Sequence, residues 1–470
     1  MKRIIYVKII LWGVVLIQFG CERAIEIRIP PKIVATEKVF SNYEDANSAV
    51  MGLYYSLGER GVNFSSAGSG LFGGLSADDL QPFDQGLPQY AEFFTNNLTQ
   101  NNPLISGTFW TPAYNVIYSA SAIITGVGNS SGLSSNNKDS LIASAKFARA
   151  YCYWYLLNFF GEVPLVTSIN YKQTSLLSRS GTEELFQFIL NDLEFAVKFL
   201  PLNYLDGKRI LPTQWAARAL LARVYLYTGK WQQAIDDADI ILNNHDLFEL
   251  SPDLTKVFTA DNREAIWQLS SNPKSPVGNV TDDGKLYIPY PNPAQSLPSY
   301  CLTENLIMVF DTSDRRLKDW TVVNTYMAGS YRIPYKYKDG RAQLSAGAIP
   351  REYNTVFRLA ELYLIRAEAM IQLGRTEESA AGLNVIRMRA GLEPINTQSK
   401  DSLLYYLYNE RRKEYFAEGA HRWFDLKRWG LADKTLGSLK GTNWQSTDQL
   451  YPIPESDLFL APNLTQNTGY

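Results

Sequence analysis

The chain offers few residues with the spacing that catalysis requires. It contains only two histidines, His245 and His421, and three widely separated cysteines, so it has neither an H-E-x-x-H zinc motif nor a metal-binding cysteine cluster. Gly128, Ser130 and Gly132 have the G-x-S-x-G spacing of a serine nucleophile. They lie in a stretch rich in Ser, Asn and Gly, without the strand-to-helix turn that exposes such a serine. We therefore predict no catalytic residue, no metal and no cofactor.

A group of charged residues near the C-terminus could instead supply acid and base groups. The segment 409–430, "NERRKEYFAEGAHRWFDLKRWG", combines arginines and His421 with the carboxylates Glu410, Glu414 and Asp425. Hydrolysis of a glycosidic bond needs a carboxylic acid that faces a second carboxylate. Charges at helical spacing more commonly pair with one another, so we predict a buried salt-bridge network here. A fold could still bring together any of the 47 acidic residues, and a glycoside hydrolase therefore stays open as an alternative.

Aromatic side chains are the more distinctive chemical feature. They make up 13% of the residues, and 29 of them are Tyr, which joins an apolar ring to a hydroxyl group. Sugar rings present apolar C–H faces and a rim of hydroxyls, so rings with Asp and Asn neighbours on loops suit them. Two stretches without helical period, 61–107 and 270–350, carry such residues. The predicted ligand contacts are Asp78, Asp79, Phe83, Tyr90, Asn96, Tyr287, Tyr290, Trp320 and Tyr326.

Each of these residues also has a purely structural interpretation. Core packing is the alternative for every ring, and capping of a loop is the alternative for Asp78 and Asp79. Trp110 shares a helical pattern with Tyr114 and is assigned to the core. The sequence 451–470 contains three prolines and is expected to lie extended against the body as a clasp.

A helical scaffold is predicted to hold these loops. Apolar residues recur at three- and four-residue steps over 142–160. Two further pairs of helical patterns, 220–242 and 362–386, each turn at a glycine, Gly229 and Gly374. Aligning these glycines brings both pairs into register, and "YTGKWQQAIDDADIIL" resembles a tetratricopeptide unit. Because one such unit does not bury its apolar face alone, we predict a mostly α-helical fold of stacked helix-turn-helix repeats with a long irregular insertion.

The N-terminus carries the pattern of an export signal. Residues 1–20 begin with basic side chains and continue in an apolar run that is too short to span a bilayer. Gly20 directly before Cys21 resembles a bacterial lipoprotein signal. We predict a signal peptide over 1–20, a lipidated tether over 21–38 and a single body over 39–470. A plain secretory peptide and a single anchor helix are the alternatives.

The overall composition limits the classes of partner. Hydrophobic residues make up 46% and charged residues 20% of the chain, as in an ordinary globular protein. The net charge of -2 argues against nucleic acid as a partner, because such proteins draw most of their affinity from clustered Lys and Arg.

Several segments, in order along the chain, resemble the SusD/RagB family. They are "EDANSAVMGLYYSL" from Glu44, "SADDL" from Ser76, "KFARAYCYWYLLNFFGEVPLV" from Lys146, "NERRKEYFAEGAHRWFDLKRWG" from Asn409 and "YPIPESDLFLAPNLTQNTGY" from Tyr451. The resemblance covers essentially the whole chain. It implies an outer-membrane lipoprotein at the cell surface of Bacteroidetes-type bacteria, built on tetratricopeptide-like helix pairs.

The same resemblance implies a function and a protein partner. A member of this family is expected to capture an oligosaccharide or polysaccharide fragment, to do no chemistry on it, and to deliver it to a SusC-like, TonB-dependent outer-membrane barrel. Two alternatives from other classes remain, a glycoside hydrolase and a tetratricopeptide-type scaffold that binds a peptide on its concave face. Turnover of an oligosaccharide would indicate the first, and absence of glycan affinity would indicate the second.

Overall fold

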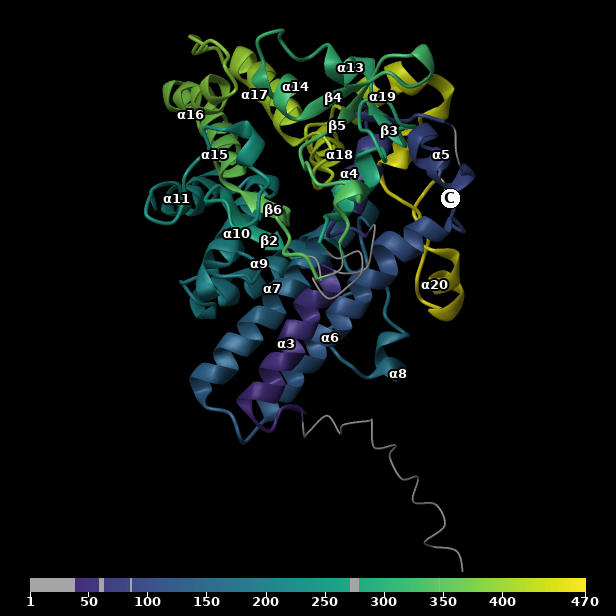
Figure 1. Ribbon diagram of the computed structural model, residues 1–470. Helices are drawn as coiled ribbons and strands as arrows, with labels where there is room; N and C mark the ends of the chain where they lie inside the picture. Colours follow the sequence, from purple (N-terminus) through teal and green to yellow (C-terminus); the bar gives the residue numbers. More distant parts are fainter. Residues whose placement is uncertain (1–38, 59–62, 85–86, 271–278, 346) are drawn as a thin grey trace, which may run out of the picture.

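A computed structural model describes residues 39–58, 63–84, 87–270, 279–345 and 347–470 (Figure 1). The predicted signal peptide, Cys21 and the tether 21–38 lie outside the described residues. Within the described part of the chain, no helix has both the length and the apolar character needed to cross a membrane.

Helices make up most of the described body, which confirms the predicted fold class. The helices of the scaffold are α3 (Tyr43–Gly58), α6 (Thr111–Asn129), α7 (Ser135–Phe160), α9 (Thr182–Phe199), α10 (Gln214–Tyr227), α11 (Trp231–Leu242), α15 (Leu359–Gln372), α16 (Thr376–Arg389) and α17 (Lys400–Tyr415). They pack in series, from α6 against α7 and α7 against α9 through to α16 against α17. Figure 1 shows α3, α6 and α7 as long neighbouring helices, with the shorter pairs beside them.

The two predicted helix-turn-helix repeats are confirmed and lie against each other. Gly229 turns the chain between α10 and α11 with φ 70°, and Gly374 does the same between α15 and α16 with φ 77°. Glycine adopts this left-handed conformation without the steric cost that a Cβ would bring. Helix α11 packs against α15, so the repeats stack directly although the insertion 243–358 separates them in sequence.

The irregular insertion is built from short strands and short helices (Figure 1). Its elements are β2 (Ala265–Leu269), α12 (Asp282–Tyr287), β3 (Tyr300–Leu302), α13 (Glu304–Ile307), α14 (Arg315–Asp319), β4 (Thr321–Asn324), β5 (Tyr331–Pro334) and β6 (Asn354–Arg358). The antiparallel pair β2 and β6 joins the two ends of the insertion, and β4 and β5 form a hairpin. The sequence pattern predicts strands only in short hairpins around 287–337, where β4 and β5 lie. The β2–β6 pair lies outside that range and is formed by two segments that meet across the insertion.

The first aperiodic stretch is more helical than its sequence pattern predicts. It contains α4 (Ala67–Ser76), β1 (Leu80–Pro82), α5 (Pro88–Thr95) and a π-helical turn (Ile105–Trp110). Every residue of α4 is buried, so the helix has no exposed face and leaves no amphipathic period in the sequence. Glycines allow this burial. A Cβ on Gly70 would lie 2.5 Å from the carbonyl oxygen of Ala417, and one on Gly73 would lie 2.5 Å from Cβ of Ala420.

The C-terminal segment follows α18 (His421–Arg428) and α19 (Ala432–Lys440) and runs along the body as predicted, with the short helix α20 (Glu455–Leu460) inserted. The amide of Tyr451 donates to the carbonyl of Phe159 at 2.8 Å, and the two rings stack with centroids 4.9 Å apart. Further along, Nδ2 of Asn467 donates to the carbonyls of Phe160 and Tyr451. Trp110, assigned to the core from its sequence pattern, is 3% exposed and packs edge-to-face against Phe160.

Candidate ligand-binding surface

The two aperiodic segments come together at a small antiparallel sheet. Strand β1 pairs with β3, so that Leu80 lies opposite Leu302 and Pro82 lies opposite Tyr300. Directly after β1, the amide of Phe83 donates to the carbonyl of Ser299 at 3.0 Å. Strand β3 also packs against β5. The loops that carry the predicted aromatic contacts are therefore held on one framework.

Three aromatic rings from these segments form an edge-to-face cluster. The ring centroid of Phe83 lies 5.8 Å from that of Tyr326 and 4.8 Å from that of Tyr331, with interplanar angles of 78° and 81°. These are favourable geometries for aromatic pairs. All three rings are partly exposed, so the cluster reaches the surface. Tyr331 was not among the predicted contacts, because its place beside Phe83 depends on the β4–β5 hairpin and the β1–β3 pairing.

Two strongly exposed side chains lie in the loops that meet at the β4–β5 turn. Tyr290 is 61% exposed and Met327 is 81% exposed. The loop that follows Tyr290 is fastened to the β4–β5 turn, because Nδ2 of Asn324 donates to two of its carbonyls, both at 2.8 Å, and the amide of Thr325 donates to a third. We name the set Phe83, Tyr290, Tyr326, Met327 and Tyr331 the aromatic surface.

Tyr90 lies on α5 and is anchored to the interior on one side. Its ring stacks on Phe72 with centroids 5.7 Å apart, and it lies 6.3 Å from the ring of Tyr300. Its side chain is partly exposed, so Tyr90 remains a candidate contact.

The predicted contacts Asp78 and Asp79 are instead partners in internal ion pairs. Oδ1 of Asp79 accepts from Nε of Arg412 at 2.8 Å, and Asp78 pairs with both Arg412 and Arg422. Burial alone would raise the pKa of Asp78, but the two guanidinium groups lower it below its usual value. With 6% and 1% of their surface exposed, these carboxylates fasten the "SADDL" segment to the 409–430 segment. Their assignment as ligand contacts is corrected.

Asn96 is also a structural residue. It is 3% exposed, ends α5 in the left-handed conformation with φ 56°, and accepts a hydrogen bond at Oδ1 from Nζ of Lys440. Asn tolerates this conformation better than most residues. Its amide therefore serves the helix end and a buried lysine, and is not presented to a ligand.

Two of the predicted aromatic platforms are buried. Trp320 has no exposed surface, and its Nε1 donates to the carbonyl of Leu254 at 2.8 Å. Tyr287 is 4% exposed, and burial raises the pKa of its hydroxyl far above the usual value. A ring that stacks on a sugar must offer a free face, so Trp320 and Tyr287 are corrected to core residues. Sequence alone did not separate them from Tyr290 and Tyr326, which lie in the same proline-rich insertion.

The charged 409–430 segment forms the predicted network of salt bridges. Arg316 pairs with Glu410 and Glu414, and Arg411 pairs with Asp425, all of them buried. Burial alone would raise the pKa of Glu414, but the surrounding arginines lower it well below its usual value. Most ion-pair partners of these residues lie outside 409–430, and few pairs join adjacent turns of one helix. His421 is buried against Tyr415, and burial lowers its pKa well below the usual value.

The strongest acid and base candidates face a cavity too small for a sugar. Asp283, Glu418 and His421 line a cavity of about 30 Å³, close to the volume of one water molecule. Burial, followed by the charges of Asp282 and Glu418, raises the pKa of Asp283 to about 8. A protonated acid near a second carboxylate is the arrangement that glycosidases use, but this cavity has no room for a glycosidic bond.

The serine of the G-x-S-x-G sequence also has a structural role. The residue Ser130 of the G-x-S-x-G sequence follows the last turn of α6, and its hydroxyl donates to the carbonyl of Phe40 at 2.5 Å. It lies at a helix end and not on a strand-to-helix turn, as inferred from its surroundings in the sequence. Among the described residues, no group of three or more His, Cys, Asp or Glu side chains could hold a metal ion.

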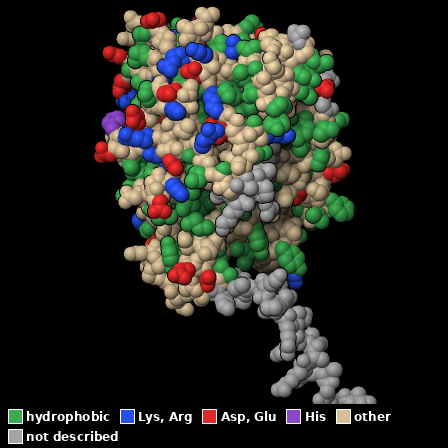
Figure 2. Space-filling view, in the orientation of Figure 1, with side chains coloured by type: hydrophobic (Ala, Val, Ile, Leu, Met, Phe, Trp, Pro, Cys, Tyr) green, Lys and Arg blue, Asp and Glu red, His purple; other side chains and the backbone are tan. Residues whose placement is uncertain are grey.

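The charges on the face drawn in Figure 2 are mixed in sign. Basic and acidic side chains alternate over its left half, where α11, α15 and α16 lie, and hydrophobic and uncharged side chains are more frequent over its right half. No extended basic area for a phosphate backbone is visible on this face.

Fold and surface together define a helical-repeat protein whose inserted loops present exposed aromatic rings. Two family models match the chain. The model described as "SusD family" matches residues 279–470, and the model described as "Starch-binding associating with outer membrane" matches residues 88–226.

Individual relatives extend this likeness over almost the whole chain. "SusD-like protein P2" of Formosa agariphila is 27% identical, and the alignment covers 94% of this chain and 95% of that protein. "Starch-binding protein SusD" of Bacteroides thetaiotaomicron is 24% identical over 70% of this chain and 72% of its own length.

Solved structures show the same fold. A SusD superfamily protein from Bacteroides vulgatus superimposes with a TM-score of 0.77 and 22% identity, covering 92% of this chain and 100% of that structure. A "Laminarin binding SusD-like protein" gives a TM-score of 0.75 with 23% identity and the same coverage. These matches assign residues 279–470 to the SusD family and show that almost the whole chain is similar to SusD-like proteins.

Proposed function

We propose that this protein captures an oligosaccharide on the aromatic surface and does not transform it. The observation that carries the proposal is the edge-to-face cluster of Phe83, Tyr326 and Tyr331, which is built from two distant loop segments. Exposed Tyr290 precedes a loop that is bonded to the β4–β5 turn of the same framework. Exposed rings supply flat apolar faces for the C–H faces of a sugar, and rigid strands hold them in place before the ligand arrives. Exposed Asp84 and Asn292 lie in the same loops and can accept or donate hydrogen bonds to sugar hydroxyls.

The names of similar proteins suggest the class of glycan. One relative is described as starch-binding and one similar structure as laminarin-binding, and both polymers are glucans. We therefore favour a neutral glucan fragment as the ligand of the aromatic surface.

Capture is proposed to take place at the outer membrane and to end with transfer. The lipoprotein-like sequence before Cys21 and the family description "associating with outer membrane" support a lipid-anchored protein at the cell surface. A captured oligosaccharide must still enter the cell, and we propose a SusC-like, TonB-dependent barrel as the partner that receives it. Pull-down of such a barrel from outer-membrane extract by the tagged, lipidated protein is the test of that partner.

Titration calorimetry of the purified body tests the glycan proposal. Malto-oligosaccharides and laminari-oligosaccharides of six or seven residues are the first ligands, with a broader glycan array as the second screen. Binding without any shortening of the oligosaccharide is the expected result. Release of shorter sugars would instead indicate a hydrolase. Binding of peptides, with no binding to any glycan on the array, would indicate a peptide scaffold.

A further inference from the structure

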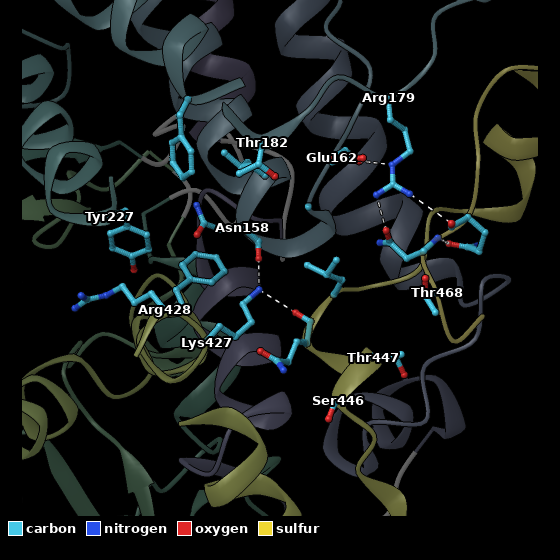
Figure 3. Close-up of a pocket in the computed structure, with 18 residues that line it drawn as sticks. Asn158, Glu162, Arg179, Thr182, Tyr227, Lys427, Arg428, Ser446, Thr447 and Thr468 are labelled. Carbon is cyan, nitrogen blue, oxygen red and sulfur yellow. Dashed lines mark hydrogen bonds between the residues drawn. The ribbon is translucent and has the colours of Figure 1, made fainter. Parts of the chain in front are cut away.

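A second cavity lies on a different set of elements from the aromatic surface. It opens between the C-terminal end of α7, the start of α9, helix α18 and the C-terminal segment (Figure 3). Its volume is about 770 Å³, within the range of small-molecule sites in proteins. None of the residues of the aromatic surface lines it.

Lys427 brings a positive charge to this cavity without an acidic partner. Its Nζ donates to the backbone carbonyl of Asn158 and, at 2.9 Å, to that of Gln449 (Figure 3). These acceptors are uncharged, and an ammonium group has a third N–H to offer. The amino group also lies 5.4 and 5.5 Å from the ring centres of Trp423 and Phe424. Within the part of the chain that the structure describes, Lys427 forms no salt bridge.

Arg179 adds a second cation of the same kind. Its Nε donates to the carbonyl of Glu162 at 2.7 Å, and Nη2 donates to Oδ1 of Asn467 at 2.6 Å. Both acceptors are uncharged. In contrast, Arg428 at the same cavity is paired with Glu368 and with Asp425. Its charge is therefore already balanced inside the protein.

Glu162 is the one carboxylate among the described residues that line the cavity. Its charge acts on Arg179, and its side chain is exposed to solvent, where water screens it, so the charge of Lys427 stays unbalanced. Thr182, which also lines the cavity, is the first residue of the 18-residue helix α9, whose first turn has no side-chain cap. The N-terminal end of a helix favours anions, but Glu183 and Glu184 already stand in this first turn, so the excess positive charge at the cavity is that of Lys427 and Arg179.

The remaining lining resembles a site for a polyhydroxylated molecule. The partly exposed rings of Phe186 and Tyr227 supply apolar faces. Hydroxyl groups and an amide also line the cavity, from Thr182, Ser446, Thr447, Thr468 and Gln449. Such groups can both donate and accept hydrogen bonds, as sugar hydroxyls require.

We propose that this cavity binds a small acidic saccharide of the uronic acid class, with the ligand carboxylate at the ammonium group of Lys427. The carboxylate supplies the charge that Lys427 lacks inside the protein, and the sugar ring lies among the aromatic and hydroxyl side chains. The site is independent of glycan capture on the aromatic surface. The protein would then bind an acidic sugar in this cavity and a neutral glycan on the aromatic surface.

Titration calorimetry with sodium glucuronate tests the proposal, with glucose and sodium sulfate as the comparison ligands. Glucuronate is expected to bind, and glucose and sulfate are expected to bind at least tenfold more weakly, because each lacks one part of the ligand. Equal affinity for glucose would show that charge is not recognised. Equal affinity for sulfate would show that no sugar is recognised. Either result overturns the proposal.

A pair of variants at the start of α9 isolates the role of charge. Thr182→Glu places a carboxylate at the cavity, in a first helical turn that tolerates acids, and Thr182→Gln has nearly the same size without the charge. Glucuronate affinity should fall at least tenfold further in Thr182→Glu than in Thr182→Gln. Equal affinity of the two variants contradicts the proposal.

Lys427→Met removes the proposed partner of the ligand carboxylate and keeps most of the side-chain stem. Glucuronate binding should weaken by tenfold or more, whereas Lys434→Met, at an exposed lysine of α19 that does not line the cavity, should leave it unchanged. A thermal melt of both variants checks folding. If Lys427→Met is folded and binds glucuronate normally, the proposal is wrong. If it does not fold, the Thr182 pair decides.

The pH dependence gives a further readout. Burial lowers the pKa of Lys427 to about 7, and the other charged or titratable side chains at the cavity are Glu162, Arg179, Arg428 and Tyr227. A bound carboxylate favours the charged form of Lys427, so affinity should fall several-fold between pH 6 and pH 8 with uptake of protons on binding. Affinity that is constant over this range, together with a normal Lys427→Met variant, rejects the assignment.

Discussion

Arg412 reaches Asp79 across 333 residues of sequence, with its Nε 2.8 Å from Oδ1 of the carboxylate. Both side chains of the pair are buried, and the pair connects the loop before β1 to α17. Nη2 of Arg412 extends the contact to Asp78 at 2.9 Å. The loop segment that leads to Phe83 and the aromatic surface is therefore positioned by a buried ion pair with the C-terminal part of the chain.

Asp79→Asn should destabilise the protein without weakening glycan binding by the folded molecules. The variant leaves the charge of Arg412 buried with Asp78 as its remaining partner, and loss of one member of a buried pair costs about 3 kcal/mol or more. Urea denaturation measures the loss. Asp84→Asn, at an exposed acid in the same loop, is the control and should leave stability unchanged. Reduced glycan affinity of Asp79→Asn at unchanged stability would restore Asp79 as a ligand contact.

Tyr290→Ala should weaken binding of the preferred oligosaccharide and leave the fold intact. The ring is largely exposed, so its loss removes a stacking contact on the order of 1.4 kcal/mol, which corresponds to about tenfold in affinity. Trp320→Ala is the matched opposite case. It should cost about 3–5 kcal/mol of stability because it opens a cavity in the core. Calorimetric titration beside a thermal melt distinguishes the two. Normal binding by both Tyr290→Ala and Tyr326→Ala would show that the aromatic surface is not the glycan site.

Asp283→Asn should change how stability depends on pH. The pKa of Asp283 is raised from an ordinary 3.8 to about 8 in the folded protein, chiefly by burial. Between about pH 5 and pH 7 the folded state holds a proton that the unfolded state has lost, so this residue makes wild-type stability fall as pH rises, by about 1.4 kcal/mol per pH unit at most. The variant does not titrate there. Its stability relative to wild type should rise from pH 5 to pH 8, as measured by urea denaturation. A constant difference would show that the carboxyl is ionised throughout.

The hydroxyl and the ring of Tyr451 should contribute separately to the C-terminal clasp. Tyr451→Phe removes the hydrogen bond with Ser76 Oγ and should cost about 1 kcal/mol. Tyr451→Ala also removes a fully buried ring that stacks on Phe159, and should cost about 3–5 kcal/mol. Denaturation of both variants under the same conditions gives the comparison. Equal losses would mean that the ring packing carries little of the stability of the clasp.

Cys21→Ala should release the mature protein from the membrane. A lipidated cysteine carries more than one acyl chain, and two chains are sufficient for stable anchoring, whereas the described body has no helix that could span a membrane. Fractionation of cells that express the variant gives the answer, with immunoblotting to check that the signal peptide has been removed. If the processed variant stays in the membrane fraction as wild type does, a lipid on Cys21 is not the anchor.

The sequence by itself determined the helical scaffold. Local signals were sufficient there, because an amphipathic helix repeats its apolar residues every three or four positions and a turn such as that at Gly229 needs a left-handed residue. The registered pairs around Gly229 and Gly374 predicted two repeats, and the structure stacks them. The core position of Trp110 could be predicted for the same reason, because it shares the helical pattern of Tyr114, although the structure places it in the π-helical turn directly before α6.

Only the tertiary structure decided which loop residues reach the surface. In the aperiodic segments, burial depends on partners far away in the sequence, so Trp320 and Tyr290 have similar local surroundings and opposite exposure. Asp79 could be assigned to an ion pair only once Arg412, 333 residues later, was placed beside it. The pairing of β1 with β3 likewise brings Phe83 to Tyr326. Such contacts leave no period in the sequence, because each depends on the folded position of both partners and not on the spacing of neighbours along the chain.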